Sequence, residues 1–585
     1  KTLFIYNGYS LVDLDHAFNI DIVFSAIAQD KNGDIWLGTK GHGLFILSKS
    51  VSDKYVLIPY NKSEQLNSIQ VQSILIDKEN NLWIGSDDFG IIKYDFKTLK
   101  FINQANGFPN NNILSFCEDH YGNIWFGTNG SGLVKYFPCP FSYFDNIDGF
   151  RNPDVFSILC DRDGGTWVAS QSSGVYRLHN SHLTKYDESS GLLSKSVRTL
   201  AQDKNGTVWI GTKNGLNYIE NGEEKVKSFD LPLENKYVRS LLCDKDGNLW
   251  IGMYGEGLLC YNGKTFTHYT SKNGINHGYI HSLLQDKHGD IWVGTGNGIN
   301  RIKNGVVENF ELGTKLCNKY IGSITMDSYG NVWFGTDRCL IRYNGQEFNS
   351  FNISDALTSN TIYLLSADSK GKVYVGTNKG IDKLTVKANG DILESKNYGL
   401  SEGFKGLECN SRSVAIDSMG NLFFGTIKGV IKYLPANDSE EDHKTSIHIT
   451  DVKLFPYEST NWLEYVSGLT PWFKLPTDLS LPGSENNISF NFTGINLFHP
   501  EKVRYKVFLE GFDKDWIEND LKNATYTNLP AGKYVFNVMA YTSDINKASK
   551  AKFEFVIRPV FWKTWWFFIL VVVLFVVGIY FFLKF

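Results

Sequence analysis

The sequence is poor in proline and has no excess of charge of either sign. Only 14 of its 585 residues are proline, and 58 lysines and arginines against 62 acidic residues give a net charge of −4. A general nucleic-acid-binding surface needs a basic excess, so this portion is not expected to bind nucleic acid directly. The hydrophobic fraction of 42% and the aromatic fraction of 15% exclude a disordered polymer, because enough apolar surface is present to offset the entropy of ordering.

Cysteine is sparse and scattered. The eight cysteines form no Cys-x-x-Cys pair and have no histidine at metal-ligand spacing, so neither a zinc site nor a redox motif is predicted, and no cofactor is expected. We interpret the cysteines as structural thiols rather than disulfides. Cys160 and Cys243 directly precede a repeated aspartate, at a strand position that suits a small buried hydrophobe.

One uncharged hydrophobic run lies near the C-terminal end. It begins at Trp565, ends at Leu583 and is 19 residues long. As a helix it would extend roughly 28 Å, close to the hydrocarbon thickness of a bilayer. Trp562, Trp565 and Trp566 suit a membrane–water interface. The sequence therefore predicts a transmembrane helix within residues 561–585, with the lipid bilayer as a partner.

Most of the remaining chain is a repeat. The motif Asp-x-x-Gly-x-apolar-Trp-x-Gly-Thr recurs ten times, mostly every 41 or 42 residues. Its aromatic positions are Trp36, Trp83, Trp125, Trp167, Trp209, Trp250, Trp292, Trp333, Tyr374 and Phe423. Its opening aspartates are Asp30, Asp77, Asp119, Asp161, Asp203, Asp244, Asp286, Asp327, Asp368 and Asp417.

One unit, residues 238–269, predicts four antiparallel strands. Asp244 is placed to bond the backbone of a tight turn in which Gly247 takes a positive φ, and a second turn signal is Asn262-Gly263. Four strands in about 42 residues is typical of a β-propeller blade. We therefore interpret the repeated aspartates as turn formers rather than as calcium ligands or catalytic acids. The repeated tryptophans are interpreted as core between blades rather than as a carbohydrate platform.

A different domain follows the repeats. Residues 436–442 are a polar linker, and strands are predicted at 447–455, 488–492, 504–509, 524–526 and 534–540. This spacing indicates a β-sandwich of about 120 residues, with Trp516 as an expected core anchor. The fold class is thus all-β: propeller blades, an immunoglobulin-like sandwich and one C-terminal transmembrane helix.

These motifs resemble the sensor portion of bacterial hybrid two-component histidine kinases. The run Asp286-Lys287-His288-Gly289-Asp290-Ile291-Trp292-Val293-Gly294-Thr295 resembles the blade signature of their two-component-regulator propeller repeats, and residues 486–540 resemble their tyrosine-rich Y_Y_Y domain. The resemblance implies two seven-bladed propellers, a sandwich, one membrane helix, and cytoplasmic kinase, receiver and often DNA-binding modules. It also implies a bacterial inner-membrane protein with the propellers and sandwich in the periplasm, and a ligand that is an oligosaccharide released from a complex glycan.

The chain departs from that pattern in two ways. It has ten repeats rather than fourteen, and it ends at Phe585 before any kinase motif. We therefore expect a partial first propeller at residues 1–140, a complete seven-bladed one at 141–435, the Y_Y_Y sandwich at 436–560 and the membrane helix at 561–585. Residues 1–9 look like the end of another unit, which suggests missing N-terminal blades or a strand-swapped closure. A homodimer is also expected.

The expected function is ligand sensing, and the expected site lies in loops that vary between blades. Variable loops on a rigid framework are where recognition is usually built. Tyrosine stacks on sugars, and arginine binds a carboxylate or sulfate through two hydrogen bonds. The predicted ligand-binding residues are Gln171, Tyr254, Glu256, His277, Tyr279, Asp337 and Arg338. No catalytic residue and no metal ligand is predicted.

Two alternatives remain open. A propeller hydrolase or lyase acting on carbohydrate would need a non-repeated acid, base or metal cluster at the mouth of the ring, and none stands out. The twelve histidines are scattered, and single ones such as His42 or His281 are interpreted as structural or exposed. A non-catalytic interaction framework is the other alternative, since propellers host many functions. Glycan turnover by the purified protein would favour the enzyme, whereas saturable binding without turnover would favour the sensor.

Overall fold

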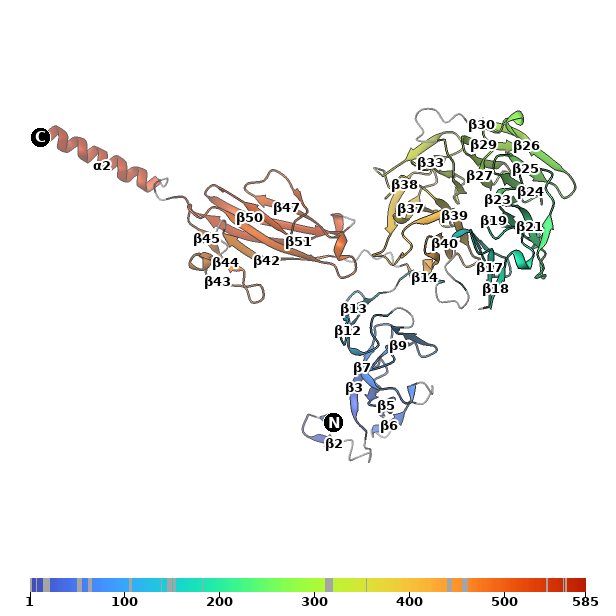
Figure 1. Cartoon of the computed structure of the whole chain (residues 1–585). Helices are drawn as coiled ribbons and strands as arrows, with labels where there is room; N and C mark the ends of the chain where they lie inside the picture. Colours follow the sequence, from blue (N-terminus) through green and yellow to red (C-terminus); the bar gives the residue numbers. More distant parts are fainter. Residues whose placement is uncertain are drawn as a thin grey trace. The chain divides into compact units, whose positions relative to one another are not determined.

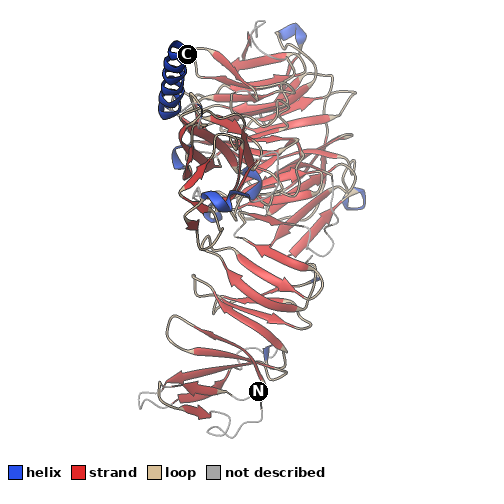
Figure 2. Cartoon of the chain, turned by 90° about the vertical axis from the view of Figure 1, so that its left-hand side faces the viewer, coloured by secondary structure: helices blue, strands red, loops and turns tan. Residues whose placement is uncertain are grey.

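In the computed structural model the regular secondary structure of the described residues is almost entirely β-strand, with one long helix at the C-terminal end (Figures 1 and 2). The structure describes all residues except 1–2, 7, 14–21, 50–54, 61–65, 105–107, 138, 145–149, 151–153, 181, 311–318, 354, 439–444, 455–460, 543–544, 561 and 563–564. The chain divides into two compact units, one made of residues 1–137 with 440–585 and the other of residues 138–439.

The unit of residues 138–439 contains seven four-stranded antiparallel sheets, consistent with propeller blades and arranged in a ring (Figure 1). We call these seven sheets the ring. Sheets one to three are β15–β18 (Val155–Cys160, Thr166–Ser170, Val175–His179, His182–Tyr186), β19–β22 (Val197–Gln202, Val208–Thr212, Gly215–Ile219, Lys227–Phe229) and β23–β26 (Val238–Cys243, Leu249–Met253, Leu258–Tyr261, Phe266–Tyr269). Sheets four to six are β27–β30 (Ile280–Gln285, Ile291–Thr295, Gly298–Lys303, Val306–Phe310), β31–β34 (Ser323–Met326, Val332–Gly335, Leu340–Tyr343, Phe348–Phe351) and β35–β38 (Leu364–Ala367, Lys372–Thr377, Gly380–Val386, Ile392–Tyr398).

The seventh sheet combines strands from both ends of the ring. Its first three strands are β39 (Cys409–Ile416), β40 (Leu422–Thr426) and β41 (Gly429–Tyr433), and its outer strand is β14 (Phe141–Tyr143). β14 pairs antiparallel with β41 although nearly 300 residues separate them, and β15 of the first sheet contacts β39 of the seventh. The ring is therefore closed by a strand that precedes the first sheet, as well as by packing of its first strands.

Each repeated aspartate organises the turn between the first two strands of its sheet. In the third sheet Asp244 accepts hydrogen bonds from the Asn248 amide nitrogen and from the Trp250 indole, both at 2.8 Å. The same aspartate–indole bond occurs in the eight repeats that carry tryptophan, from Asp30–Trp36 to Asp327–Trp333, at 2.7–3.2 Å. The turn interpretation is confirmed, and the link to the tryptophan adds a reason for the fixed spacing of six residues.

The repeated tryptophan packs against the next sheet, as expected. Trp250 belongs to a buried cluster with Ile280, Ile291 and Val293 of the fourth sheet. The glycine two residues later is required by the same close approach. A Cβ on Gly252 would lie 2.1 Å from Ser240 Oγ and 2.7 Å from Ile280 Cγ2, so the adjacent sheets approach each other too closely for a side chain there.

Residues 1–137 contain three further sheets and a two-stranded hairpin. The strands are β1 (Phe4–Tyr6), β2 (Leu11–Asp13), β3 (Phe24–Gln29), β4 (Ile35–Thr39), β5 (Leu44–Lys49), β6 (Tyr55–Pro59), β7 (Val71–Ile76), β8 (Leu82–Ser86), β9 (Ile91–Tyr94), β10 (Leu99–Ile102), β11 (Ile113–Glu118), β12 (Ile124–Thr128) and β13 (Gly132–Tyr136). β3–β6 and β7–β10 form four-stranded sheets, whereas β11–β13 form a sheet of three.

The C-terminal β region has a five-stranded sheet, a three-stranded sheet and a short pair. The strands are β42 (Ser446–Leu454), β43 (Gly468–Leu469), β44 (Pro476–Thr477), β45 (Leu479–Leu481), β46 (Ile488–Ile495), β47 (Arg504–Glu510), β48 (Ile517–Asn519), β49 (Asn523–Tyr526), β50 (Gly532–Tyr541) and β51 (Ser549–Ile557). All five predicted strands are present. The core between the sheets includes stacked Phe490 and Phe536 rings, with centroids 4.1 Å apart.

Trp516 is not a core residue, so that prediction was wrong. It is only half-buried and packs against Phe508, with ring centroids 5.7 Å apart. The alternation of β47 explains the difference. Val507 and Leu509 point into the core, whereas Phe508, and with it Trp516, lies on the opposite face of the sheet.

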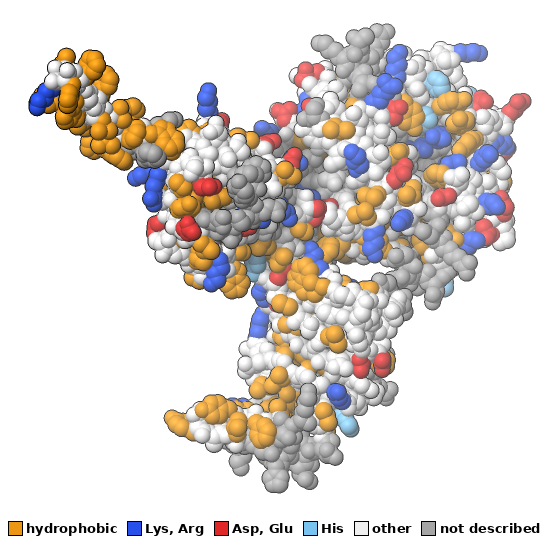
Figure 3. Space-filling model, turned by 60° about the vertical axis from the view of Figure 1, so that its left-hand side comes forward, with side chains coloured by type: hydrophobic (Ala, Val, Ile, Leu, Met, Phe, Trp, Pro, Cys, Tyr) orange, Lys and Arg blue, Asp and Glu red, His pale blue; other side chains and the backbone are white. Residues whose placement is uncertain are grey.

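The long helix α2 (Trp565–Lys584) matches the predicted run and is long and apolar enough to cross a membrane. Hydrophobic side chains cover its visible surface (Figure 3). Short 3-10 turns complete the described structure at Glu188–Ser190, Ser271–Asn273, Pro435–Asn437, Asn461–Tyr465, Pro500–Lys502 and Ile545–Lys547.

The cysteines are mostly but not wholly free thiols. Burial raises the pKa of Cys160 and of Cys243 to about 12, as expected for thiols in apolar surroundings. Cys339 is disulfide-bonded, so the expectation of structural thiols alone was wrong. A disulfide forms only between cysteines that lie close together in the folded chain. The spacing of cysteines along the sequence does not show which of them do.

Candidate functional site

The first strands of four consecutive ring sheets share a β-bulge. The register shifts between Val155 and Ser157, between Val197 and Thr199, between Val238 and Ser240, and between Ile280 and Ser282. The residues at the shifts are Phe156, Arg198, Arg239 and His281. A bulge redirects its side chain, and these first strands contact one another around the ring. Neighbouring sheets therefore place two arginines, a histidine and an aromatic ring at equivalent positions near the ring centre.

A third arginine comes from a wider irregularity in the seventh sheet. In β39 the register shifts between Cys409 and Val414, and Arg412 within this segment has a φ of 61°. Its Nη1 donates to the backbone oxygen of Arg239 at 3.2 Å and to that of His281. Because these acceptors belong to the third and fourth sheets, Arg412 reaches across the ring centre. We call Arg198, Arg239 and Arg412 the central arginines.

The central arginines are positioned by groups that carry no negative charge. Arg239 Nε donates to His281 Nδ1 at 2.9 Å, and the Arg198 guanidinium lies 4.1 Å from the centroid of the Phe156 ring. Within the described residues no carboxylate forms an ion pair with any of the three. Glu408, just before β39, instead accepts a hydrogen bond from the Tyr363 hydroxyl at 3.3 Å.

Burial and the charges of neighbouring arginines lower the pKa values of His281 and Arg412. Burial, followed by the charges of Arg239 and Arg412, lowers the pKa of His281 from 6.5 to about 3. His281 is therefore neutral at physiological pH and serves Arg239 as an acceptor. Burial, followed by the charge of Arg239, lowers the pKa of Arg412 to about 10. Both shifts have the direction expected where positive charges gather away from solvent.

Tyrosines form a surface beside the central arginines. The rings of Tyr254 and Tyr279 stack at a centroid distance of 4.3 Å and an angle of 14°, and each residue is 37% exposed. Tyr237 lies 5.0 Å from Tyr254, and His277 lies 4.7 Å from Tyr279. The Arg239 guanidinium is 5.5 Å from the Tyr254 centroid. We call Tyr237, Tyr254 and Tyr279 the tyrosine cluster.

The structure thus brings together three of the seven predicted site residues, Tyr254, His277 and Tyr279. The other four occupy equivalent loops after the second strand of their sheets: Gln171 in the first, Glu256 in the third, and Asp337 and Arg338 in the fifth. Within the described residues, no hydrogen bond or ring contact joins the side chains of Gln171, Glu256 or Arg338 to the tyrosine cluster. Equivalent loops of successive antiparallel sheets lie at the same end of the ring.

The central arginines were not identified from the sequence. His281 is buried and accepts a hydrogen bond from Arg239, which agrees with its interpretation as a structural histidine. A signal was present in the sequence. The segments Val-Arg-Thr at 197, Val-Arg-Ser at 238 and Ile-His-Ser at 280 place polar residues at the same position of consecutive repeats.

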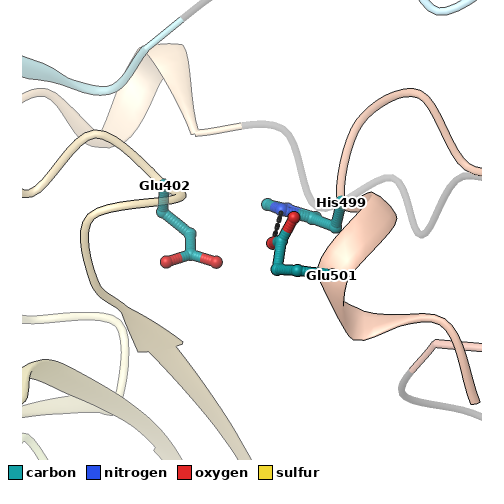
Figure 4. Close-up of side chains that lie close together, drawn as sticks. All are labelled: Glu402, His499 and Glu501. Atoms are coloured by element: carbon teal, nitrogen blue, oxygen red, sulfur yellow. Dashed lines mark ion pairs between the residues drawn. The ribbon is translucent and has the colours of Figure 1, made fainter.

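Three further residues have metal-ligating side chains and are shown in Figure 4. Glu402 belongs to the unit of residues 138–439, where its carboxylate accepts hydrogen bonds from the Gly399 amide nitrogen at 2.7 Å and from the Ser401 hydroxyl at 2.9 Å. His499 and Glu501 belong to the other unit and form an ion pair of 3.5 Å (Figure 4). Each of the three thus has a role within its own unit.

Comparisons with protein-family models match two features of the chain. The two component regulator propeller model matches residues 18–41, 65–88, 107–130, 191–214, 232–255, 274–297 and 315–338, and the Y_Y_Y domain model matches residues 496–558. The repeats around Trp167, Tyr374 and Phe423 are not among these segments, yet each forms a sheet of the ring.

Two individual proteins are similar to the chain. The crystal structure of the extracellular domain of the putative hybrid two component system BT3049 from B. thetaiotaomicron superposes with a TM-score of 0.75 and 25% identity, covering 95% of this chain and 75% of that one. A protein named histidine kinase P4, from Formosa agariphila, is 22% identical over 194 residues, which are 33% of this chain and 14% of that kinase.

Proposed function

We propose that this chain, which carries two-component-regulator propeller repeats and a Y_Y_Y domain, is the ligand-sensing extracytoplasmic portion of a membrane-bound two-component sensor histidine kinase. The similarity to the extracellular domain of a putative hybrid two component system supports this proposal. The helix Trp565–Lys584, long and apolar enough to cross a membrane, would connect the sensor to a cytoplasmic kinase. A kinase catalytic domain is not evident in the 585 residues.

In this proposal residues 141–435 are a complete seven-bladed propeller and residues 1–140 a partial one. The pairing of β14 with β41 and the contact of β15 with β39 support the closed ring. Residues 436–560 are the immunoglobulin-like Y_Y_Y sandwich, supported by the family match at 496–558. In this proposal the propellers and sandwich lie in the periplasm, and the helix within 561–585 anchors them in the bacterial inner membrane. The similarity to an extracellular domain and the length and apolar character of the helix support this placement.

The ligand is an oligosaccharide derived from a glycan, and the tyrosine cluster is its main contact. The stacked and partly exposed rings of Tyr254 and Tyr279 carry this proposal, because flat aromatic faces beside polar groups suit sugar rings. Further polar contacts come from loops at the same end of the ring, through Gln171, Glu256, His277, Asp337 and Arg338. Sensing of polysaccharide breakdown products would then control genes for their use.

Signalling requires the ligand to prefer one arrangement of the modules, because a ligand with equal affinity for two states shifts neither. The sandwich lies between the ring and the membrane helix in the chain, so it is the element that would pass the change on. A homodimer gives a simple route for such a change to reach a paired kinase.

Binding of oligosaccharides to the full chain in detergent tests the proposal. Calorimetric titration with a panel of plant and algal oligosaccharides should give saturable binding by at least one of them. Tyr254→Ala and Tyr279→Ala should each weaken that binding about tenfold or more, as expected for loss of a stacking contact plus its neighbours. Tyr329→Ala is the matched control, because Tyr329 is exposed in a turn at the opposite end of the ring.

Equal affinity in Tyr254→Ala, Tyr279→Ala and the control would remove the tyrosine cluster from the site. The same samples test the enzymatic alternative. New products detected by chromatography after incubation with the bound oligosaccharide would favour a hydrolase or lyase. Unchanged oligosaccharide after saturable binding is the result that the sensor proposal expects.

A further inference from the structure

We propose that the central arginines form an anion-binding site at the ring centre, so that the ligand is an acidic oligosaccharide whose carboxylate or sulfate group enters beside Arg198, Arg239 and Arg412. The identity of the ligand as an oligosaccharide rests on the proposed function. The anion site itself rests on the geometry of the arginines. Neutral oligosaccharides would lack the group that this site is built to hold.

The positive charge of the central arginines is unbalanced. Three guanidinium groups from the second, third and seventh sheets come together, because Arg412 bonds the backbone of Arg239 and both Arg198 and Arg412 interact electrostatically with Arg239. Within the described residues none of the three has a carboxylate partner. Like charges held together in a partly buried place are unfavourable unless an anion compensates them. Elsewhere in the ring, arginines form ion pairs with carboxylates. The Arg177 guanidinium, for example, lies 3.1 Å from the Asp161 carboxylate. The central arginines therefore lack the charge compensation that Arg177, Arg301 and Arg342 have.

The central arginines have unused hydrogen-bond donors. Arg198 Nε is buried and has no hydrogen-bond partner among the described residues. Arg412 uses Nη1 for two backbone oxygens, and Arg239 uses Nε for His281. No described residue accepts a hydrogen bond from the remaining nitrogens of these two side chains. A buried donor without an acceptor is costly, and an oxyanion that accepts several such bonds removes the cost.

Arg239 and Arg412 are held in place before any ligand binds. Arg412 keeps a φ of 61°, a strained value for a residue other than glycine, within an enlarged bulge. Arg239 is fixed by a neutral histidine, which can accept its Nε–H without neutralising its charge. Such positioning without charge compensation is what recognition of an anion requires, because the full positive charge stays available to the ligand.

The tyrosine cluster beside Arg239 indicates a ligand larger than an inorganic anion. The Arg239 guanidinium lies 5.5 Å from the Tyr254 centroid, and Tyr254 stacks on Tyr279. A sugar ring on the tyrosine cluster would thus place a carboxylate or sulfate substituent within reach of Arg239. An inorganic anion would fill only the arginine part of this site, whereas an acidic oligosaccharide would use both parts.

Two measurements with the full chain in detergent test the inference. In the first, sodium sulfate is titrated at constant ionic strength against sodium chloride, and the melting temperature is recorded. Sulfate should raise the melting temperature of the unmodified chain, and this rise should be lost in Arg198→Gln and Arg239→Gln. Arg162→Gln is the control, because Arg162 is exposed in a turn at the opposite end of the ring. An equal response to the two salts, or an equal sulfate response in all variants, would overturn the anion site.

The second measurement compares matched oligosaccharides by calorimetry. An oligogalacturonate, a sulfated galactan oligosaccharide and a neutral galactan oligosaccharide of equal length separate carboxylate, sulfate and neutral ligands. The account expects one acidic ligand to bind about tenfold or more tightly than the neutral one, with the preference lost in Arg239→Gln. Neutral binding of equal strength would overturn the inference and leave the proposed function intact. A sulfate response without binding of any oligosaccharide would keep the anion site and count against the proposed function.

Discussion

The carboxylate of Asp438 accepts a hydrogen bond from the Lys383 ammonium at 2.7 Å. Asp438 also accepts from Lys396 at 2.9 Å, from the Tyr433 hydroxyl at 2.8 Å and from the Tyr398 hydroxyl. These donors belong to the sixth and seventh sheets, and Asp438 lies just after the last ring strand. The cluster therefore fastens the chain where it leaves the ring, next to the strand pair that closes it.

This cluster predicts a loss of stability in acid. Burial alone would raise the pKa of Asp438, but hydrogen bonds from Lys383, Tyr398 and Lys396 outweigh it and lower the pKa from 3.8 to about 2. A group whose pKa is lowered by folding stabilises the protein above its unfolded pKa, and that contribution disappears as the pH falls through the folded value. The shift corresponds to about 2 kcal/mol, lost between about pH 4 and pH 2.

Thermal melts of Asp438→Asn measure this contribution. The variant should melt at lower temperature than the unmodified chain at pH 7, and the difference should shrink as the pH falls from 4 to 2. Asp246→Asn serves as the control, because Asp246 is exposed in a ring turn. A difference that stays constant across this pH range would show that Asp438 does not act through its charge.

The aspartate–tryptophan bond predicts different costs for its two partners. Asp244→Ala removes acceptors from the Trp250 indole and from the Asn248 amide nitrogen and side chain, and should destabilise the ring by about 2–4 kcal/mol. Trp250→Phe removes one donor and should cost less, since Phe423 already follows Asp417 in the seventh sheet. Denaturant unfolding, monitored by tryptophan fluorescence, measures the loss of stability in each of the two variants and shows which loss is larger. A larger cost for Trp250→Phe would assign the main role to indole packing.

The positive φ of the turn glycine Gly247 can be tested by substitution. Gly247 has a φ of 92°, which a β-branched residue adopts only with strain. Gly247→Val should lower stability by a few kcal/mol, whereas Gly247→Asn should cost much less, because Asn80 holds the equivalent turn position with a φ of 70°. Melting curves of the two variants check this. An unshifted curve for Gly247→Val would contradict the turn assignment.

Replacing Arg338 should weaken ligand binding without lowering the stability of the fold. Its side chain is exposed in the loop after β32, and its backbone amide donates to Thr336 Oγ1 at 3.1 Å. Arg338→Ala keeps that backbone bond, so the melting temperature should not change, while the affinity for a verified oligosaccharide should fall several-fold. Calorimetric affinity that stays the same would remove Arg338 from the site.

Local features were predictable from the sequence because neighbouring residues determine them. The strands around Trp250, the turn at Asp244, the positive φ of Gly247 and the apolar helix that begins at Trp565 all follow from patterns within a few residues. Each is confirmed by the structure. Repetition strengthened the prediction, since the same pattern occurs in ten units.

Features that depend on distant contacts were not predictable in this way. The pairing of β14 with β41, the donors around Asp438 and the disulfide of Cys339 each join segments whose contact no local pattern indicates. The site shows the same limit. Tyr254 and Tyr279 were predicted from loop position, but Arg412 reaches the ring centre only because β39 bulges, and a bulge of that size leaves no clear mark in the sequence.

Hydrogen–deuterium exchange of the full chain with and without a bound oligosaccharide tests the central claim most directly. The account predicts slower exchange in peptides covering residues 252–258 and 275–281, which carry Tyr254 and Tyr279, and no change in the turn peptide of residues 244–248. Slower exchange only in the C-terminal β region, or equally slower exchange at both ends of the ring, would contradict ligand binding at the loops that carry Tyr254 and Tyr279.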